Sequence, residues 1–361
     1  MYFSKKAEKA SLLLRISRIW VDILRMTLMF NFMKDKTNTT FLNRRAAITG
    51  LGAAFLLGHV RPLQAAAAQI SVVATTGMIA DVVRQVGGDL VSVKALMGPG
   101  VDPHAYRQTR SDIVAMTRAD IVLWHGLYLE AQMERFFEDL SRKGRVVPIA
   151  EGVSQDLLVS HADYEGRYDP HIWMDPILWR DVVVAIRDEL SVFHPEHAAQ
   201  FKTNADTFLM ELDALADYAV ASLAKIPRDK RVLLTAHDAF SYFGRAYDFE
   251  VIGIQGISTE SEAGLNRISE LVDLLVTRDI GAVFVETSVS DRNMRALIEG
   301  AAAQGHAVSI GGSLYSDAMG QDGTYEGTYL GMIDHNVTTI ARALGADVPQ
   351  SGRLGRLGLE S

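Results

Sequence analysis

At the centre of the 361-residue chain, residues Pro195–Pro227 read PEHAAQFKTNADTFLMELDALADYAVASLAKIP, the longest helical signal in the sequence. Proline is favoured in the first turn of a helix, as at Pro195, and Pro227 ends the pattern. The apolar residues between them recur at helical spacing: Phe201, Phe208, Leu212, Leu215, Tyr218 and Leu223. About 30 residues rising ~1.5 Å each would span roughly 45 Å, the width of a domain. The stretch therefore predicts a stiff helical linker.

On both sides of this linker, apolar runs of strand length alternate with helical stretches. The runs are Ile70–Thr75, Val91–Leu96, Ile121–His125 and Val146–Ala150 before it, and Val232–Ala236, Val251–Gln255, Val283–Glu286 and Ala307–Ile310 after it. The helical stretches are Arg110–Arg118, Leu129–Arg142, Ala263–Thr277, Asp291–Gln304 and Glu326–Leu344. Such alternation predicts parallel sheets with helices on both faces.

The expected fold class is therefore α/β, with two lobes that are each a parallel sheet flanked by helices, joined by one long rigid α-helix. The expected boundaries are an N-terminal lobe at 69–193, a linking helix at 194–228 and a C-terminal lobe at 229–361. No residue-level repeat is visible, so the relation between the lobes is one of architecture.

Residues 1–68 have the features of an export signal preceded by an extension. Paired arginines, Arg44 and Arg45, precede an apolar run to about Gly58, and the small residues Ala65–Ala68 offer a cleavage site. This pattern is typical of a twin-arginine signal, with a Sec signal as the alternative. Met33 opens a stretch that resembles an ordinary start, so the preceding residues are either a real extension or a start-site error.

Charge and cysteine content restrict the function classes. Residues 1–68 carry 11 of the 36 basic and 3 of the 44 acidic residues, which leaves 25 basic and 41 acidic residues from position 69 onward, a net charge of −16. Nucleic acid needs a basic surface, so we expect no such partner, whereas cations would be attracted. The chain has no cysteine for a disulfide, a thiolate ligand or lipid attachment. We therefore expect a soluble periplasmic monomer.

Three histidines and one aspartate stand in loop-like contexts just beyond predicted strands or turns. They are His104 in GPGVDPHAY, His171 in DPHIWMDP, His237 in LLTAHDAF and Asp317 in GGSLYSDAMG. In open α/β sheets ligands bind beyond the carboxyl ends of the strands, where such loops lie. Three imidazoles and a carboxylate can fill a tetrahedral shell around Zn²⁺. The competing interpretation is that each is an ordinary solvated or capping residue.

Six ordered motifs favour the metal site. They are DPHAY at Asp102–Tyr106, DPHIWMDP at Asp169–Pro176, TAHDAF at Thr235–Phe240, GISTESEA at Gly256–Ala263, FVETS at Phe284–Ser288 and GGSLYSDAMG at Gly311–Gly320. With these motifs, the chain from about residue 70 to 345 resembles the zinc/manganese solute-binding proteins of ABC importers, the TroA-like family.

The resemblance implies a fold, a ligand set and partners. It implies two pseudo-related α/β lobes on a rigid helix, with one Zn²⁺ or Mn²⁺ ion held between them by His104, His171, His237 and Asp317. It also implies delivery of that ion to an ABC permease and its ATPase in the inner membrane. Glu286, at the end of a predicted strand, could orient a ligand histidine, or it could bond to backbone amides.

The identity of the metal stays open at this point. Three imidazoles favour Zn²⁺, because Mn²⁺ prefers oxygen ligands. Manganese-specific relatives commonly carry glutamate where this chain has His237. Zinc-specific relatives, however, often have a histidine-rich loop between the first two ligands, and the interval 151–170 holds only His161.

The rival functions are a zinc hydrolase and a metal-dependent adhesin. A catalytic zinc usually keeps three protein ligands and an open position for water, whereas four ligands close the shell. The sequence also lacks the HExxH and GxSxG motifs and a cysteine nucleophile. A dedicated adhesive module is not apparent either. We therefore expect a metal carrier with no catalytic residues and no resident cofactor.

Overall fold

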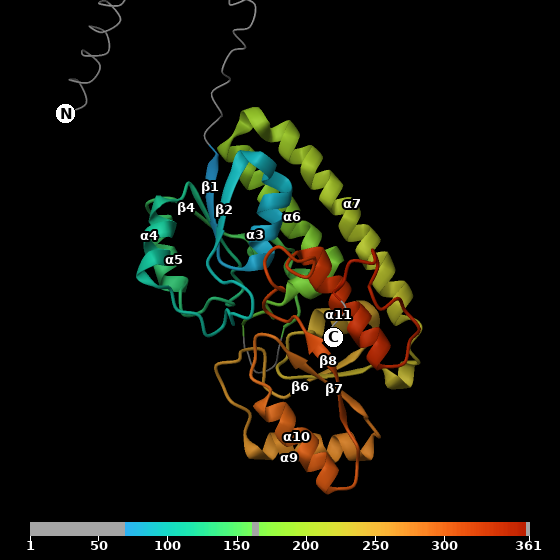
Figure 1. Ribbon diagram of the computed structural model, residues 1–361. Helices are drawn as coiled ribbons and strands as arrows, with labels where there is room; N and C mark the ends of the chain where they lie inside the picture. The colour runs from blue at the N-terminus through green and yellow to red at the C-terminus, as the bar shows by residue number, and fades with distance from the viewer. Residues whose placement is uncertain (1–68, 161–165, 359–361) are drawn as a thin grey trace, which may run out of the picture. The chain divides into compact units, whose positions relative to one another are not determined.

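The strands of the first half form one parallel sheet, as the alternating pattern predicts. The structure, a computed structural model, describes residues 69–160 and 166–358 (Figure 1), so the predicted export signal and His161 lie outside it. The strands are β1 (Ile70–Ala74), β2 (Val91–Ala95), β3 (Ile121–Trp124) and β4 (Arg145–Pro148), in the order β2-β1-β3-β4. The central strand β1, ISVVA, is apolar along most of its length because both faces of the sheet are covered.

The strands of the second half also pair in parallel, but they form two two-stranded sheets. These are β5 (Val232–Thr235) with β6 (Glu250–Gly253), and β7 (Ala282–Glu286) with β8 (Ser309–Leu314). Neighbouring β5 and β7 lie in contact. A register shift between Val283 and Phe284 interrupts the β7–β8 pair. All eight predicted runs are strands, each within a few residues of its expected bounds.

Nine α-helices surround the strands in the described part of the chain. They are α3 (Gly77–Gly87), α4 (Arg110–Arg118), α5 (Glu134–Ser141), α6 (Pro176–Phe193), α7 (Ala198–Leu223), α8 (Ser241–Tyr247), α9 (Leu265–Thr277), α10 (Arg292–Ala303) and α11 (Tyr329–Ala343). Within the same residues, no helix is both long and apolar enough to cross a membrane.

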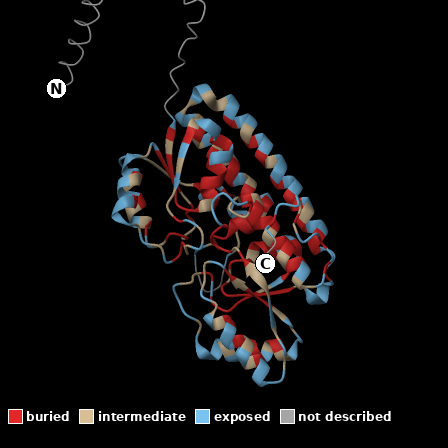
Figure 2. Ribbon diagram, in the orientation of Figure 1, coloured by how far each residue is buried: buried red, intermediate tan, exposed pale blue. Residues whose placement is uncertain are grey.

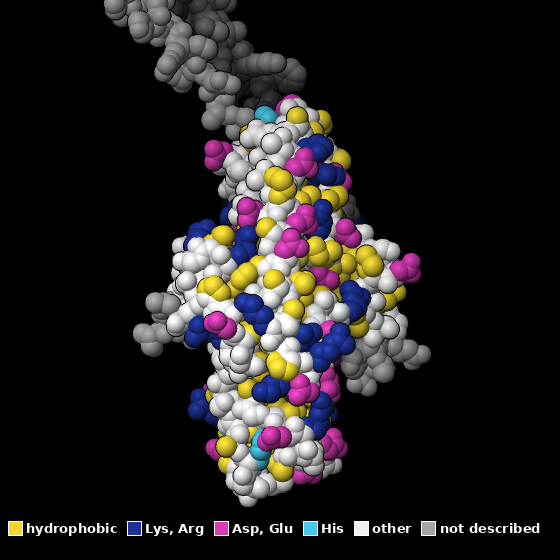
Figure 3. All heavy atoms as spheres, turned by 90° about the vertical axis from the view of Figure 1, so that its right-hand side faces the viewer, with side chains coloured by type: hydrophobic (Ala, Val, Ile, Leu, Met, Phe, Trp, Pro, Cys, Tyr) yellow, Lys and Arg dark blue, Asp and Glu magenta, His cyan; other side chains and the backbone are white. Residues whose placement is uncertain are grey.

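Helix α7 is the predicted long linker. Its 26 residues span about 39 Å, and its apolar positions face inward at helical spacing from Phe201 to Leu223. The helix contacts α3 of the first half and α11 of the second (Figure 1). Its outward side is exposed in Figure 2, and Figure 3 shows acidic and basic side chains interspersed with small apolar patches on this side of the molecule. One rigid element therefore braces both halves.

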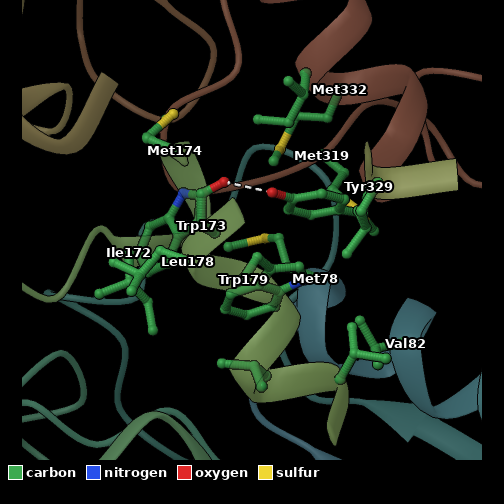
Figure 4. Close-up of a cluster of buried hydrophobic side chains, with 14 of the residues drawn as sticks. Met78, Val82, Ile172, Trp173, Met174, Leu178, Trp179, Met319, Tyr329 and Met332 are labelled. Atoms are coloured by element: carbon green, nitrogen blue, oxygen red, sulfur yellow. Dashed lines mark hydrogen bonds between the residues drawn. The ribbon is translucent and has the colours of Figure 1, made fainter. Parts of the chain in front are cut away.

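A hydrophobic core continues from the first half into the second. Met78 and Val82 of α3 and Trp179 of α6 lie beside Tyr329 and Met332 of α11 (Figure 4). The Tyr329 hydroxyl donates a 2.8 Å hydrogen bond to the carbonyl of Trp173, and the Tyr329 amide donates to Asp81 Oδ2 at 2.9 Å. Trp173 and Trp179 are fully buried packing residues. The halves are joined by packed side chains as well as by α7.

Four helices differ from the sequence prediction: α5 begins late, and α3, α6 and α8 lie outside the predicted helical stretches. The helix predicted over Leu129–Arg142 begins only at Glu134, after a run of turns that starts with Leu127 and Tyr128 in left-handed backbone conformations, with φ of 52° and 68°. Helix α6 was not predicted, although Pro176 occupies its first position and Asp175 caps its N-terminal amides. That cap forms part of the DPHIWMDP motif, so the motif carries a helix start as well as a histidine.

Candidate metal site

The four sequence-predicted residues converge at the ends of strands and helices from both halves. His104 lies in the loop between β2 and α4, and His171 lies directly before the short 3₁₀ turn Ile172–Met174 that leads into α6. His237 follows β5, and Asp317 follows β8. Each half therefore contributes two of the four side chains, which together form a possible metal-binding group.

The distances among these side chains fit one small ion. His104 Nε2 and His171 Nε2 are 3.2 Å apart, and His171 Nε2 and His237 Nε2 are 3.4 Å apart. Asp317 lies 3.4 Å from His171 Nε2 through Oδ1 and 3.3 Å from His237 Nε2 through Oδ2. Ligand bonds of about 2.0–2.1 Å in a tetrahedron place neighbouring donor atoms roughly 3.3 Å apart. The cage has the dimensions of a tetrahedral zinc shell.

The cage is buried and contains an unsatisfied acceptor. His171 and His237 are 0% exposed, Asp317 is 2% exposed and His104 is 4% exposed. Asp317 Oδ1 has no hydrogen-bond partner among the described residues. Its contact with His171 Nε2, at 3.4 Å, is too long for a good hydrogen bond, so a cation bound here would satisfy this buried oxygen.

Each of two histidines is oriented by its own carboxylate. Asp169 Oδ1 accepts from His171 Nδ1 at 2.7 Å and from the His171 amide at 2.9 Å. Glu286 Oε2 pairs with His237 Nδ1 at 2.5 Å, while its Oε1 accepts from the His237 amide at 2.9 Å. Both rings are thereby turned with Nε2 towards the centre, which is the usual arrangement behind metal-binding histidines.

These surroundings shift the pKa values of the three histidines in different directions. Burial lowers the pKa of His104 to about 3, against the opposing effect of Asp317. Burial also disfavours charge on His171, but Asp169 and Asp317 outweigh it and raise the pKa of His171 to about 9. The pKa of His237 is likewise raised, because Asp317 and Glu286 outweigh burial. The raised pKa values of His171 and His237 therefore favour their protonated forms beside these carboxylates when no metal is bound.

Contacts between the halves hold the ligand loops. Asp102 Oδ1 accepts from the His104 amide at 2.8 Å, and Asp102 Oδ2 accepts from Thr259 Oγ1 at 2.5 Å. On another side, Trp173 Nε1 donates to the carbonyl of Ser316, the residue before Asp317, at 2.7 Å. The first-half histidine loops are thus bonded to second-half segments next to the site.

A cavity of about 220 Å³ reaches the site from solvent on the His104 side. Its lining includes Tyr128 and Arg167 from the first half and Ser258 and Glu260 from the second. Of the three candidate histidines, His104 lines this cavity, whereas His171 and His237 do not and are 0% exposed. An ion entering by this route meets His104 first.

The remaining candidates divide into three groups. Glu286 has both of the contacts considered for it, to a histidine ring and to a backbone amide. Asp169 was not singled out, although its position two residues before His171 was the signal that could have identified it. His125 is fully buried, with Nε2 2.7 Å from the Pro170 carbonyl, and His194 and His197 are half-buried.

The similarity to known proteins extends over all four residues of the candidate site. The chain matches the family described as zinc-uptake complex component A, periplasmic, over residues 72–343. It is 46% identical over 277 residues to the manganese-binding lipoprotein MntA of Bacillus subtilis, covering 76% of this chain and 90% of that protein. Identity to the zinc-binding protein TroA of Treponema pallidum is 44% over 275 residues, covering 76% and 88%. The solved structure of that TroA superposes with a TM-score of 0.75 at 42% identity, covering 76% of this chain and 99% of the other.

Proposed function

Because the chain belongs to the family of zinc-uptake complex component A, periplasmic, we propose that it is the solute-binding protein of an ABC importer. It captures one divalent transition-metal ion and delivers it to the permease, which works with its ATPase in the inner membrane. We place the protein in the periplasm as a monomer. The metal is cargo, and no resident cofactor is required.

The cage of four donors carries this proposal. His104, His171 and His237 offer imidazole nitrogens, and Asp317 offers a buried oxygen without a hydrogen-bond partner among the described residues. The separations of 3.2–3.4 Å suit a tetrahedral ion, and a shell of four protein ligands leaves no open position for an activated water. This favours a carrier over a zinc hydrolase.

We propose Zn²⁺ as the better ligand and Mn²⁺ as a close second. Three imidazoles with one carboxylate bind Zn²⁺ more tightly than Mn²⁺ by the order of divalent metal affinities. Asp317 could supply both oxygens and so accommodate Mn²⁺. The names of the relatives divide in the same way, with manganese for MntA and zinc for TroA. Cells also select by availability, so tighter zinc binding is compatible with manganese cargo.

We divide the chain into lobes at 69–193 and 229–361, joined by a linking segment at 194–228. With this division, both lobes contribute residues to the cage. An ion would tie His104 and His171 to His237 and Asp317, so the loaded and empty proteins differ at the lobe interface. The shared core and helix α7 oppose wide opening. Small tilts and loop rearrangements are therefore the expected motion.

Metal analysis tests this proposal. The protein is purified without a polyhistidine tag and without chelators, its metal content is measured, and Zn²⁺ and Mn²⁺ are titrated into metal-free protein. We expect one tightly bound equivalent, which His237→Ala removes or weakens by several orders of magnitude. The matched control is His335→Gln, a half-buried histidine outside the cage whose Nε2 contacts the Ser313 carbonyl. Unchanged tight binding in the His237 variant would exclude the assigned site.

A further inference from the structure

A second group of metal-ligating side chains lies at the junction of α6 and α7. The sequence there is His194-Pro195-Glu196-His197, and its last three residues form a 3₁₀ turn. The His197 amide donates to the His194 carbonyl at 3.0 Å. Side chains three residues apart eclipse each other in such a turn, which places the rings of His194 and His197 5.9 Å apart and nearly parallel at 22°.

The donor atoms of this group are already close together. His194 Nδ1 lies 2.8 Å from Glu196 Oε1, and one donor atom from each of His194, Glu196 and His197 lies within 4.8 Å of the others. Pro195 restricts the backbone between them, so ordering the turn around an ion costs little entropy. The two histidines are half-buried and the glutamate is exposed, so an ion can reach them from solvent without deep dehydration.

The position also favours a cation. His194 caps the C-terminal end of α6, where its amide donates to the Leu190 carbonyl at 2.9 Å and the helix dipole is negative. The positive N-terminal end of the α7 dipole weakens this attraction for a cation. The negative charge of the Glu196 carboxylate compensates for that weakening. The 18 residues of α6 place this turn about 27 Å from the helix start, which closely follows His171 (Figure 1). The group is therefore separate from the buried cage.

We propose that His194, Glu196 and His197 form a second, solvent-accessible site for a borderline divalent metal. Two imidazoles and one carboxylate make three protein ligands, and water completes the shell. This set binds Zn²⁺ in preference to Mn²⁺. The site binds more weakly than the cage, because it has one ligand fewer and competes with solvent. It does not depend on the transport function proposed above.

Titration of untagged, metal-free full-length protein with Zn²⁺ alone tests this site. The wild-type protein should bind two equivalents, one tight and one weaker. The double variant His194→Ala/His197→Ala should lose the weaker equivalent and keep the tight one. His237→Ala should show the reverse, losing the tight equivalent and keeping the weaker one. Failure of the cage and failure of the surface site are thus distinguished.

The control is His306→Ala, since His306 is another half-buried histidine near a carboxylate, with Nδ1 3.8 Å from Asp279 Oδ1. It belongs to neither metal-ligating group among the described residues and should keep both equivalents. Titration with Mn²⁺ should show no weaker equivalent in the wild-type protein. A wild-type protein that binds one equivalent of Zn²⁺, or a double variant that still binds two, would overturn the proposal. The His194–Glu196 contact would then only stabilise the turn.

Discussion

The loops around His104 and His171 share the tripeptide Asp-Pro-His but position their histidines differently. In both loops the aspartate Oδ1 accepts from the histidine amide, at 2.8 Å for Asp102 and 2.9 Å for Asp169. Asp169 also accepts from the His171 ring, whereas Asp102 uses its other oxygen to bind Thr259 in the opposite half. One histidine is therefore held by its own loop, and the loop of the other is anchored across the site.

The consequence is a division between a central and a peripheral member of the proposed ligand set. His171 Nε2 lies within 3.4 Å of donor atoms of His104, His237 and Asp317, and its side chain is fully buried. His104 lines the solvent cavity. The shared motif provides a candidate ligand in each case, but the groups around the aspartate decide whether that histidine lies at the base or at the entrance of the site.

Removing each histidine should give the largest difference between the two loops. We expect His171→Ala to weaken Zn²⁺ binding more than about a thousandfold, which corresponds to ~4 kcal/mol. The factor by which His104→Ala reduces Zn²⁺ affinity should be smaller by about tenfold or more. Cavity water can replace a peripheral ligand, as in zinc sites with three protein ligands. Competition with a chromogenic chelator measures both. His171→Gln, which better preserves volume, checks that misfolding does not cause the loss, and equal losses in the two loops would contradict the division.

Replacing the two aspartates should separate the loops more finely. Asp169→Asn keeps the shape but removes the charge behind His171, and loss of such a partner typically costs 10–100-fold in metal affinity. Asp102→Asn should cost less than about tenfold, because Asp102 bonds to the His104 amide and to Thr259 rather than orienting the His104 ring. Calorimetry with Zn²⁺ compares the two variants. A larger loss from Asp102→Asn would show that the cross-site bond matters more than the ring partner.

The pKa difference predicts how binding depends on pH. His171, with a pKa raised to about 9, holds a proton in the metal-free protein at neutral pH, whereas His104, at about 3, does not. Zn²⁺ must displace that proton, so affinity should rise by about tenfold per pH unit for each displaced proton and level off near pH 9. Calorimetry in buffers of different ionisation enthalpy counts the protons. The Asp169→Asn variant should release fewer protons when Zn²⁺ binds. If the wild-type protein released no protons at pH 7, the assigned protonation would be refuted.

The same shift affects the metal-free fold. The pKa of His171 is raised from its ordinary value of 6.5 to about 9, so its protonated form stabilises the folded state. This contribution is fully present below pH 6.5 and disappears as the pH rises towards 9. The thermal stabilisation produced by Zn²⁺ should therefore grow over that interval, which differential scanning calorimetry of metal-free and loaded protein can follow.

The sequence was sufficient for elements and residues whose signals are local. Alternating strands and helices, the apolar spacing in α7 and the loop positions of His104, His171, His237 and Asp317 could all be predicted. The pairing of β5–β8 into two sheets could not, because strand pairing depends on tertiary packing. The different environments of the two Asp-Pro-His loops were also unpredictable, since Thr259 is 157 residues from Asp102 in the sequence.

Breaking the bond across the site should have the smallest effect, and on rate more than on affinity. Thr259→Val removes the hydroxyl that donates to Asp102 Oδ2 while keeping the side-chain volume. A hydrogen bond to a charged group contributes about 1.5–3 kcal/mol, but Asp102 and Thr259 are both half-buried, so water can replace part of it. We therefore expect Zn²⁺ release to quicken about two- to fivefold, with capture nearly unchanged, because this bond closes the His104 side after the ion has entered. Rapid mixing of loaded protein with excess chelator measures the release. Thr277→Val, at an exposed position of α9 where the hydroxyl bonds to carbonyls of its own helix, is the matched control and should release at the wild-type rate. If Thr259→Val slowed release, the bond would favour the open rather than the closed entrance, and the peripheral role of His104 would have to be reassigned.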